Sequence, residues 1–450
     1  MLGVRVFRAT RCVPAAAAVL PREVAPTVRK AGVSLPLARV VAPLRPLTTA
    51  AIRCAHAPNA QQVETGPLEV TESLANERKV SVVFGDKSSS SFPYVWLREN
   101  CQCRACFNKI AIARTFLVED LDLDIKPKDV QVTDGGLTVE WPDGHVSSFD
   151  GPWLHQRAFT QEARERQRSR YMLEKVHWGP EFQVPRVEYR PIMEDDRALL
   201  EWILLLERYG VVMLENSSTK KGAINDLINH FAFVKGTHYG TDYELVTNGT
   251  PNNLAYTGVK LGLHTDLPYY ELPPGTTWLH CIQQHVGEGG ANDVTDGLNA
   301  AKVLRERHPH HFETLVNTNL YFQDRGFEIY QFDKITKMRT IELDDLGNPN
   351  KIHLASQSRD SIMDLDSDGV IAFYHALKAF NHILYELSIR VKTTPGDILV
   401  MDNTRVLHGR TYFNDVSSNS TRRIHNAYVD WDELRSTRRV LQDKLNVSIT

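Results

Sequence analysis

From about residue 186 to residue 430, short strand-like segments alternate with turns that are rich in glycine, proline and asparagine. One long helical pattern interrupts them, because Phe373, Leu377, Phe380 and Leu384 recur on one helical face. Many short strands with a few decorating helices are typical of a β-sandwich or a jelly roll. We therefore expect residues 186–450 to form a mainly β, jelly-roll domain with decorating helices.

The preceding part of the chain has a different pattern. A chain of 450 residues is long for one core, so two or three structural units are expected. Residues 66–155 read as a small β-rich unit, with strand-like runs at residues 80–84, 92–97, 130–133 and 137–141. Asp134-Gly135-Gly136 separates the last two runs and predicts a hairpin turn. Residues 156–185, rich in Arg, Glu and Gln, predict a helical connector.

The first 65 residues differ in charge from the rest of the chain. Residues 1–63 contain nine Lys or Arg and one acid, whereas the remainder has 43 basic and 54 acidic residues. A basic, acid-poor, Ala- and Val-rich head is typical of a mitochondrial transit peptide, although a basic tail without an addressing role would have the same composition. The longest apolar run, Val13 to Leu20, is too short to span a bilayer, and a net charge of -3 gives no reason to expect a nucleic-acid partner.

Three of the six cysteines are crowded together, at Cys101, Cys103 and Cys106. Zinc prefers four ligands held tetrahedrally, so three local thiolates need one more ligand. The best candidate is His145, on the tight turn that starts at Trp141. The pattern predicts a structural zinc site; three cysteines without a metal are the alternative.

His264-Thr265-Asp266 places an imidazole and a carboxylate two residues apart, on the same side of an expected strand. A non-haem Fe(II) centre needs two histidines and one carboxylate on one face. His408, which follows a buried-looking strand and precedes Gly409, is the candidate second histidine. For any single histidine, a satisfied core residue remains the alternative.

Arg422 and Arg423 follow His408 by 14 and 15 residues, just before another expected strand. An arginine beside a metal can bind a dicarboxylate co-substrate through two parallel hydrogen bonds.

Together these residues resemble the γ-butyrobetaine dioxygenase and trimethyllysine dioxygenase family of Fe(II)/2-oxoglutarate oxygenases, over roughly residues 90–440. The stretches that carry the resemblance are Tyr94-Val95-Trp96-Leu97-Arg98-Glu99-Asn100-Cys101, Trp141-Pro142-Asp143-Gly144-His145, Asn253-Leu254-Ala255-Tyr256-Thr257, His264-Thr265-Asp266, Pro273-Pro274-Gly275, Leu279-His280-Cys281 and Leu407-His408-Gly409-Arg410. Residues 427–432 look closer to the γ-butyrobetaine branch.

The resemblance implies a zinc-bearing N-terminal domain and a jelly-roll (double-stranded β-helix) catalytic domain, usually in a homodimer. It implies that Cys101, Cys103, Cys106 and His145 bind zinc and that His264, Asp266 and His408 bind iron. It also implies that Arg422 binds 2-oxoglutarate, because Arg422 precedes Tyr428 by the number of residues that is usual in the family. A trimethylammonium group would lie among the rings of Tyr239, Tyr243, Tyr256 and Tyr428, and Asn253 would face the substrate's carboxylate.

The activity that the resemblance implies is hydroxylation of γ-butyrobetaine to L-carnitine, with decarboxylation of 2-oxoglutarate to succinate and with ascorbate as a reductant. Dioxygenation of trimethyllysine or of another betaine is the alternative within the class. A non-catalytic, zinc-stabilised betaine-binding protein is the alternative outside it. The γ-butyrobetaine enzymes are typically cytosolic, so a cytoplasmic location is the second choice after the mitochondrial one.

The sequence departs from the family at three places on the expected substrate side. Tyr243 stands where the family has tryptophan, and Leu267 where the γ-butyrobetaine branch has tyrosine. Residues 352–356, which include Ala355, replace an aromatic- and asparagine-bearing segment. The departures concern the substrate rather than the iron or the co-substrate.

Overall fold

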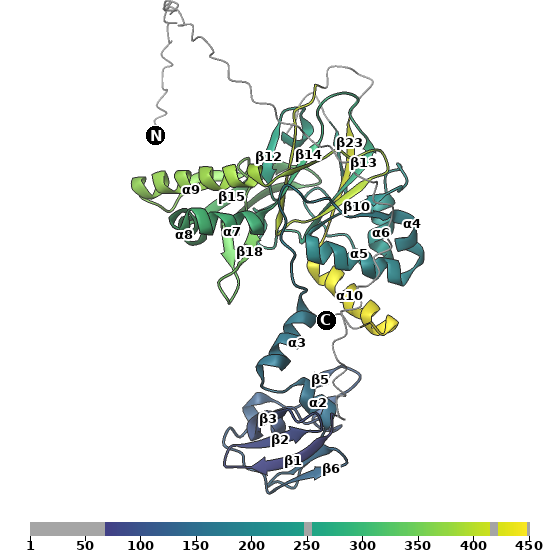
Figure 1. The fold of residues 1–450 in the computed structure, drawn as a ribbon, viewed down its shortest axis with the longest axis vertical. Helices are drawn as coiled ribbons and strands as arrows, with labels where there is room; N and C mark the ends of the chain where they lie inside the picture. The colour runs from purple at the N-terminus through teal and green to yellow at the C-terminus, as the bar shows by residue number, and fades with distance from the viewer. Residues whose placement is uncertain (1–67, 247–253, 415–421, 448–450) are drawn as a thin grey trace, which may run out of the picture. The chain divides into compact units, whose positions relative to one another are not determined.

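The computed structural model describes residues 68–246, 254–414 and 422–447, all within one of the chain's two units, Thr65–Thr450. The expected transit peptide and Asn253 lie outside the described residues. Figure 1 gives the order of the helices and strands along the chain. Among the described residues, no helix is both long enough and apolar enough to cross a bilayer.

Residues 68–156 form two three-stranded antiparallel sheets and a short two-stranded one. The first sheet contains β1 (Val70–Ala75), β2 (Lys79–Phe84) and β3 (Ser89–Pro93), and the second contains β6 (Asp129–Thr133), β7 (Gly136–Glu140) and β8 (Val146–Asp150). The short elements between and after them are α1 (Tyr94–Glu99), the two-stranded sheet of β4 (Phe107–Asn108) and β5 (Ala113–Arg114), η1 (Val118–Asp120) and α2 (Gly151–Gln156). Both three-stranded sheets contribute to one apolar core, which includes Val82, Phe92, Val139 and Trp141.

The hairpin between β6 and β7 is confirmed, because Asp134 and Gly135 both have positive φ, of 51° and 71°. Consecutive left-handed residues give the turn that matches the twist of two antiparallel strands. The strand expected at residues 92–97 is wrong beyond Pro93. Tyr94, Leu97 and Arg98 are the buried residues of α1, and their spacing of three and four is helical.

The connector is helical only in α3 (Gln161–Tyr171). After α3 the chain has no helix until α4 (Tyr189–Glu194), so the expectation of a helical connector through residue 185 is wrong in its second half. There the backbone makes hydrogen bonds with α5 (Asp196–Tyr209), for example from the Val176 amide to the Arg208 carbonyl at 2.9 Å. Asp195 caps α5, and Gly210, with a φ of 75°, ends it.

Two sheets form the jelly roll. The larger has the strand order β11 (Tyr243–Val246), β23 (Arg423–Val429), β13 (Thr276–Gln283), β21 (Ile398–Asp402), β10 (Val211–Glu215) and β9 (Arg186–Glu188). The smaller has the order β12 (Leu261–His264), β22 (Val406–Arg410), β14 (Asn292–Asp296) and β20 (Ile389–Val391). Pairing in both is antiparallel except between β9 and β10. Leu279 of the larger sheet and Val294 of the smaller belong to one buried cluster.

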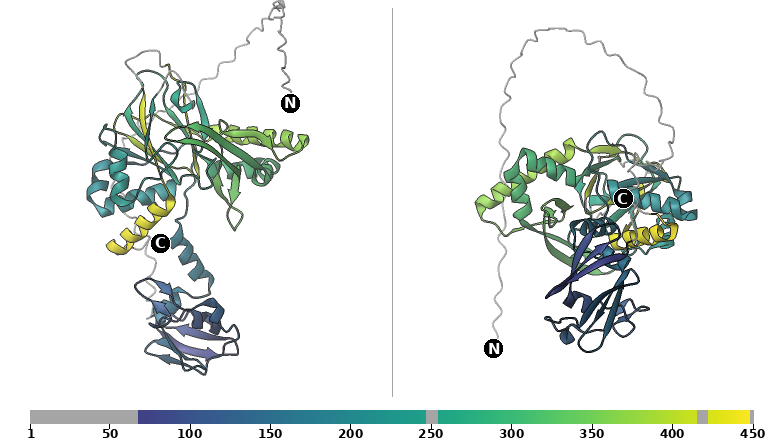
Figure 2. Two further views of the ribbon diagram at one scale, coloured as in Figure 1. Left: turned by 180° about the vertical axis from the view of Figure 1, so that it is seen from behind. Right: turned by 60° about the horizontal axis from the view of Figure 1, so that its bottom comes forward.

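Helices cover the jelly roll from two sides (Figures 1 and 2). On one side, α4, α5, α6 (Ala223–Phe231) and α10 (Trp431–Leu445) share a core with the larger sheet, where Trp202 packs beside Trp278. On the other lie α7 (Gly297–Arg307), α8 (Pro309–Asn317) and α9 (Ser367–Glu386).

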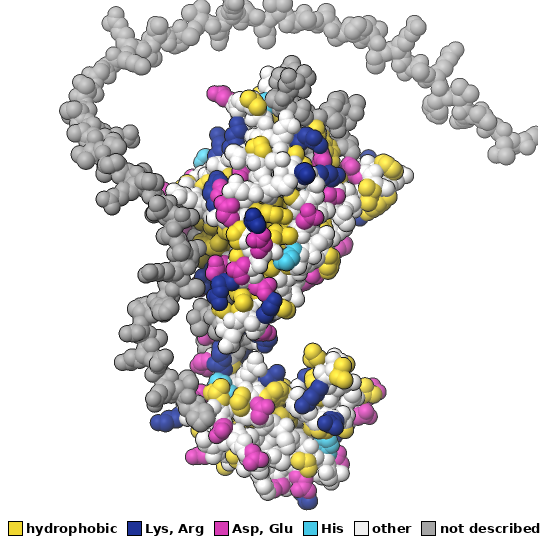
Figure 3. Space-filling model, turned by 90° about the vertical axis from the view of Figure 1, so that its right-hand side faces the viewer, with side chains coloured by type: hydrophobic (Ala, Val, Ile, Leu, Met, Phe, Trp, Pro, Cys, Tyr) yellow, Lys and Arg dark blue, Asp and Glu magenta, His cyan; other side chains and the backbone are white. Residues whose placement is uncertain are grey.

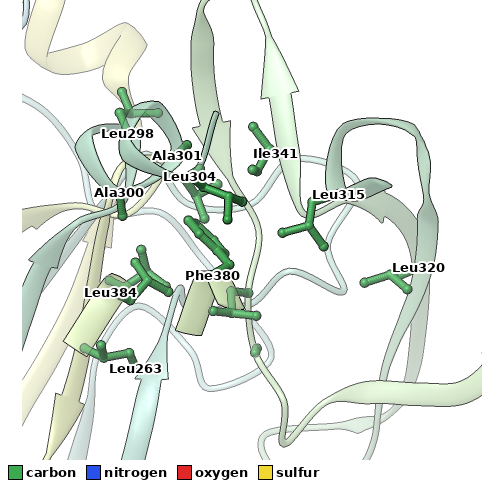
Figure 4. Packing of buried hydrophobic residues seen from close by; sticks show 14 of the residues in the cluster. Leu263, Leu298, Ala300, Ala301, Leu304, Leu315, Leu320, Ile341, Phe380 and Leu384 are labelled. Atoms are coloured by element: carbon green, nitrogen blue, oxygen red, sulfur yellow. The ribbon is translucent and has the colours of Figure 1, made fainter. Parts of the chain in front are cut away.

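The helices α7, α8 and α9 enclose a second core. Leu304, Phe380 and Leu384 meet there (Figure 4). The chain between α8 and α9 supplies further strands, namely β15 (Asn319–Phe327), β16 (Gln331–Arg339), β17 (Ile341–Leu343), β18 (Pro349–Ile352) and β19 (Arg359–Met363).

Basic and acidic side chains are interspersed over the face of the molecule in Figure 3.

Candidate metal centres and active site

The β12–β22 pair places two histidines beside each other. His264, the last residue of β12, is the register partner of His408 in the middle of β22. Asp266 lies beyond the end of β12 rather than on it, so the expectation that His264 and Asp266 share one strand is wrong. The chain turns directly after Asp266, at Leu267, whose φ is 55°, and the Asp266 carboxylate lies beside both histidines.

The three side chains converge at one point. His264 Nε2 lies 3.4 Å from Asp266 Oδ1, and His408 Nε2 lies 3.7 Å from the same oxygen. One ligand atom from each residue falls within 4.8 Å of the others. Two imidazoles and one carboxylate on one face are the donor set of a non-haem Fe(II) centre. The residues present therefore fit the metal that the sequence predicts.

Neighbouring groups orient the donor atoms. The Nδ1 atom of His264 donates to the Gly262 carbonyl at 2.9 Å, which leaves Nε2 as the unprotonated nitrogen. Thr277 Oγ1 donates to Asp266 Oδ2 at 2.8 Å, and the Asn403 side chain holds both the amide and the carbonyl of Asp266, at 2.7 and 2.9 Å. Burial opposes ionisation of Asp266, but the two histidines and Thr277 outweigh it and hold its pKa well below the ordinary value.

Gly409 explains why the two strands can approach so closely beside the histidines. A Cβ atom on Gly409 would lie 2.7 Å from the Leu261 carbonyl oxygen across the strand pair. Only glycine therefore allows β22 to approach β12 at this position, next to His408. The glycine after His408 is therefore required by the close packing of the two strands.

Of the two candidate arginines, only Arg422 faces the site. Arg422 is 5% exposed, lines the same cavity as the metal triad, and its Nε atom has no hydrogen-bond partner among the residues that the structure describes. Burial, with the nearby Arg410, lowers its pKa to about 10, so it remains charged at neutral pH. Arg423 points away and pairs with Glu244 at 2.7 Å. A buried, charged guanidinium facing a cavity fits an anionic ligand.

A cavity of about 280 Å³ joins these groups. Its wall includes His264, Asp266, His408 and Arg422, together with the four tyrosines of the expected aromatic cage: Tyr239, Tyr243, Tyr256 and Tyr428. The Tyr239 and Tyr243 rings are stacked, with centroids 4.3 Å apart, and the Tyr428 ring lies 6.2 Å from that of Tyr243. Burial raises the pKa of Tyr256 to about 12, so this hydroxyl is protonated at neutral pH.

The departures from the family also lie on this wall. Leu267 and Ala355 line the cavity and are 6% and 2% exposed. Gln357 and Ser358 line it as well, and the buried hydroxyl oxygen of Ser358 has no hydrogen-bond partner in the described part of the chain. Sequence reasoning missed Gln357 and Ser358, because the short chain segment after Ala355 carries no motif.

The cysteine cluster is also confirmed as an assembled donor set. His145 Nε2 lies 3.3, 3.8 and 3.6 Å from the sulfur atoms of Cys101, Cys103 and Cys106. Tetrahedral zinc with ordinary bond lengths separates its ligand atoms by roughly 3.6 Å, so the four side chains fit that ion. Burial and the adjacent Arg98 lower the pKa of His145, which favours the neutral imidazole that a metal requires.

Two family models match most of the described chain. Residues 169–428, more than half of the chain, match the family described as "Taurine catabolism dioxygenase TauD, TfdA family". Residues 72–155 match "Gamma-butyrobetaine hydroxylase-like, N-terminal". Among solved structures, an asparagine oxygenase in complex with Fe(II), 3-hydroxyasparagine and succinate has a TM-score of 0.42 at 12% identity, covering 54% of this chain and 83% of that one.

Curated relatives match over most of the chain. The γ-butyrobetaine dioxygenase of Homo sapiens is 34% identical over 84% of this chain and 98% of its own length, and that of Pseudomonas sp. (strain AK-1) is 32% identical over 84% and 96%. The mitochondrial trimethyllysine dioxygenase of Homo sapiens is 28% identical over 78% and 82%. The protein is thus a 2-oxoglutarate-dependent Fe(II) dioxygenase, and it belongs to the TauD, TfdA family, in the group that contains the γ-butyrobetaine dioxygenases.

Proposed function

We propose that the protein hydroxylates γ-butyrobetaine to L-carnitine. The observation that carries the proposal is the single cavity lined by the metal triad, a buried arginine and four tyrosine rings. The sequence relatives named above support the choice of substrate.

In this proposal His264, Asp266 and His408 hold Fe(II), and Arg422 binds the far carboxylate of 2-oxoglutarate. Iron with 2-oxoglutarate would supply the oxidising chemistry: one atom of O2 enters succinate as 2-oxoglutarate loses carbon dioxide, and the other enters a substrate C–H bond. The protein's own groups orient: Thr277 and Asn403 fix the Asp266 carboxylate, and the cavity wall holds one C–H bond toward the metal. Ascorbate would keep the iron reduced.

The substrate's trimethylammonium group would lie against the tyrosine rings. Such a group offers no hydrogen-bond donor but is attracted to aromatic faces. Its carboxylate would lie at the hydroxyl of Ser358 and the amide of Gln357, which also line the cavity, with Asn253 as the third candidate. Ser358 supports this placement because its buried oxygen has no partner within the described residues.

Trimethyllysine is the second candidate substrate, and Asp324 is the observation in its favour. The Asp324 carboxylate lines the cavity beside Tyr269. It could pair with the α-ammonium group of trimethyllysine, which γ-butyrobetaine lacks. Leu267 and Ala355 offer no polar atom to either substrate's carboxylate.

The remaining assignments concern the rest of the molecule. Cys101, Cys103, Cys106 and His145 would hold a structural zinc ion, because four protein ligands leave no open position for a substrate. Residues 1–65 would be a mitochondrial transit peptide, residues 66–155 the zinc domain, residues 156–185 a connector and residues 186–450 the catalytic domain. A homodimer is expected from the family resemblance, and light scattering of the purified protein tests it.

The test of the substrate is a comparison of kcat/KM for γ-butyrobetaine and trimethyllysine, in the parent and in Asp324→Asn. The proposal expects the higher value for γ-butyrobetaine in both proteins. A higher value for trimethyllysine in the parent that falls selectively in Asp324→Asn would replace the first candidate with the second.

A further inference from the structure

Tyr243 contributes a hydroxyl group as well as an aromatic ring, and a neighbouring ring limits how much of its own ring a ligand can contact. Tyr239 stacks on Tyr243 with an angle of 20° between the ring planes and 4.3 Å between the centroids. One face of the Tyr243 ring is therefore covered by another side chain. At most one face remains for a quaternary ammonium group.

The hydroxyl of Tyr243 lies in a chain of hydrogen bonds that ends on the candidate iron ligand. Asn426 Nδ2 lies 3.1 Å from the Tyr243 hydroxyl, which lies 2.8 Å from the Tyr428 hydroxyl. The Tyr428 hydroxyl in turn donates to Asp266 Oδ2 at 3.3 Å. Asn426 and Tyr428 sit two residues apart on β23, so their side chains share the face of the sheet that lines the cavity.

The donors and acceptors of this chain can be assigned in only one direction. A metal-binding carboxylate accepts hydrogen bonds, so the single proton of Tyr428 is used on Asp266. The Tyr428 oxygen must then accept from Tyr243, and the Tyr243 oxygen accepts from the Asn426 amide. Each hydroxyl is thereby oriented by the group before it.

This arrangement has a consequence for the metal centre. Tyr428 and Thr277 both donate to Oδ2 of Asp266, whereas Oδ1 faces the two histidines. Two donors on one oxygen hold the carboxylate in the rotation that presents the other oxygen to a metal.

We propose that Tyr243 is a positioning residue for the iron site: its hydroxyl orients the Tyr428 hydroxyl, which holds Asp266 in its metal-binding rotation. The inference rests on the proposed function only in taking Asp266 as an iron ligand, and it does not depend on which quaternary ammonium compound is the substrate. The tyrosine hydroxyl both donates to Tyr428 and accepts from Asn426, whereas an indole N–H only donates and could not accept from Asn426.

The test is a double-mutant cycle read by Fe(II) affinity in the absence of substrate. The variants are Tyr243→Phe, Tyr428→Phe and the double variant, titrated with Fe(II) without oxygen against a competing chelator. We expect Tyr428→Phe to weaken Fe(II) binding about tenfold or more and Tyr243→Phe about threefold to tenfold. Because Tyr243 acts through Tyr428, Tyr243→Phe should have no further effect in the Tyr428→Phe background.

Three controls distinguish the positioning role of the Tyr243 hydroxyl from a general effect of losing a hydroxyl, from loss of the ring and from loss of folding. Tyr321→Phe removes another tyrosine hydroxyl that donates to a carboxylate, that of Asp364, outside the cavity, and should leave Fe(II) affinity unchanged. Tyr243→Leu removes the ring as well, so it should match Tyr243→Phe in Fe(II) affinity but additionally raise the substrate KM. Thermal unfolding of the metal-free variants shows whether the fold is intact.

An unchanged Fe(II) affinity in Tyr243→Phe would overturn the inference, as would effects that multiply in the double variant. If the parent binds Fe(II) no more tightly than His264→Ala, the proposed function fails first and the inference fails with it. If the parent binds Fe(II) and the cycle behaves as expected but no betaine is hydroxylated, only the proposed substrate fails.

Discussion

Arg422 gives the sharpest prediction, because its neighbour in sequence is a matched control. Arg422 and Arg423 are adjacent, but Arg422 is 5% exposed and lines the cavity, whereas Arg423 is largely exposed and pairs with Glu244. Replacing each with glutamine removes one positive charge at nearly the same place in the chain. The two variants therefore differ mainly in whether the cavity or the surface loses the charge at the start of β23.

The expected effects differ by orders of magnitude. Removing one partner of a buried, hydrogen-bonded charge pair costs about 2–5 kcal/mol, which corresponds to a rise of roughly 30-fold to several thousand-fold in the KM for 2-oxoglutarate. Losing an exposed ion pair costs about 0–1 kcal/mol, so Arg423→Gln should change that KM by less than about fivefold. Arg422→Lys should fall between the parent and Arg422→Gln, because lysine keeps the charge but loses the two-pronged geometry.

The assay is succinate formation at varied 2-oxoglutarate concentration, with thermal unfolding of each variant as the measure of folding. Without co-substrate, Arg422→Gln removes a buried positive charge whose Nε atom has no hydrogen-bond partner within the described residues, so the unfolding temperature should fall little. An Arg422→Gln variant with an unchanged KM, or an Arg423→Gln variant with the larger rise, would refute the reasoning about which arginine binds the co-substrate.

Three further predictions concern other parts of the molecule. Cys103→Ser should reduce bound zinc, measured by elemental analysis, from one ion per chain to a small fraction and lower the unfolding temperature, whereas Cys281→Ser should retain zinc. Ser358→Ala should raise the KM for γ-butyrobetaine by about fivefold or more with little change in that for 2-oxoglutarate; equal effects on both would contradict its placement at the substrate's carboxylate. Gly409→Ala should destabilise the protein by about 1–3 kcal/mol in urea unfolding and weaken Fe(II) binding, because its Cβ would collide with the Leu261 carbonyl; wild-type behaviour would show that β12 and β22 can separate freely.

Local features of the fold could be predicted from the sequence where a short segment determines its own conformation. The turn at Asp134 and Gly135, the cap at Asp195 and the helix end at Gly210 all depend on residues within a few positions of one another. The segment after Pro93 could not, because alternating and helical apolar patterns overlap there and burial against the core selects the helix.

In the candidate site, too, local features could be predicted and long-range contacts could not. Its donor residues could be identified from their chemistry and spacing, but not the groups that orient them. Asn403 holds Asp266 across 137 residues of chain, and His264 meets His408 only through strand pairing. The sequence also placed Asp266 on the strand of His264, since nothing in the sequence signals that Leu267 adopts a positive φ. Long-range pairing of this kind depends on the register of the whole sheet.

The central claim is that the metal triad, Arg422 and the tyrosine rings act together on γ-butyrobetaine. The most direct test measures both products of one reaction, with the purified, Fe(II)-loaded protein, 2-oxoglutarate, oxygen and γ-butyrobetaine. We expect succinate and a product heavier by one oxygen atom, identified as carnitine, to form in equal amounts, and His264→Ala to form neither. Succinate without hydroxylated product would contradict the proposed substrate, and no succinate with any quaternary ammonium compound would contradict the assigned site.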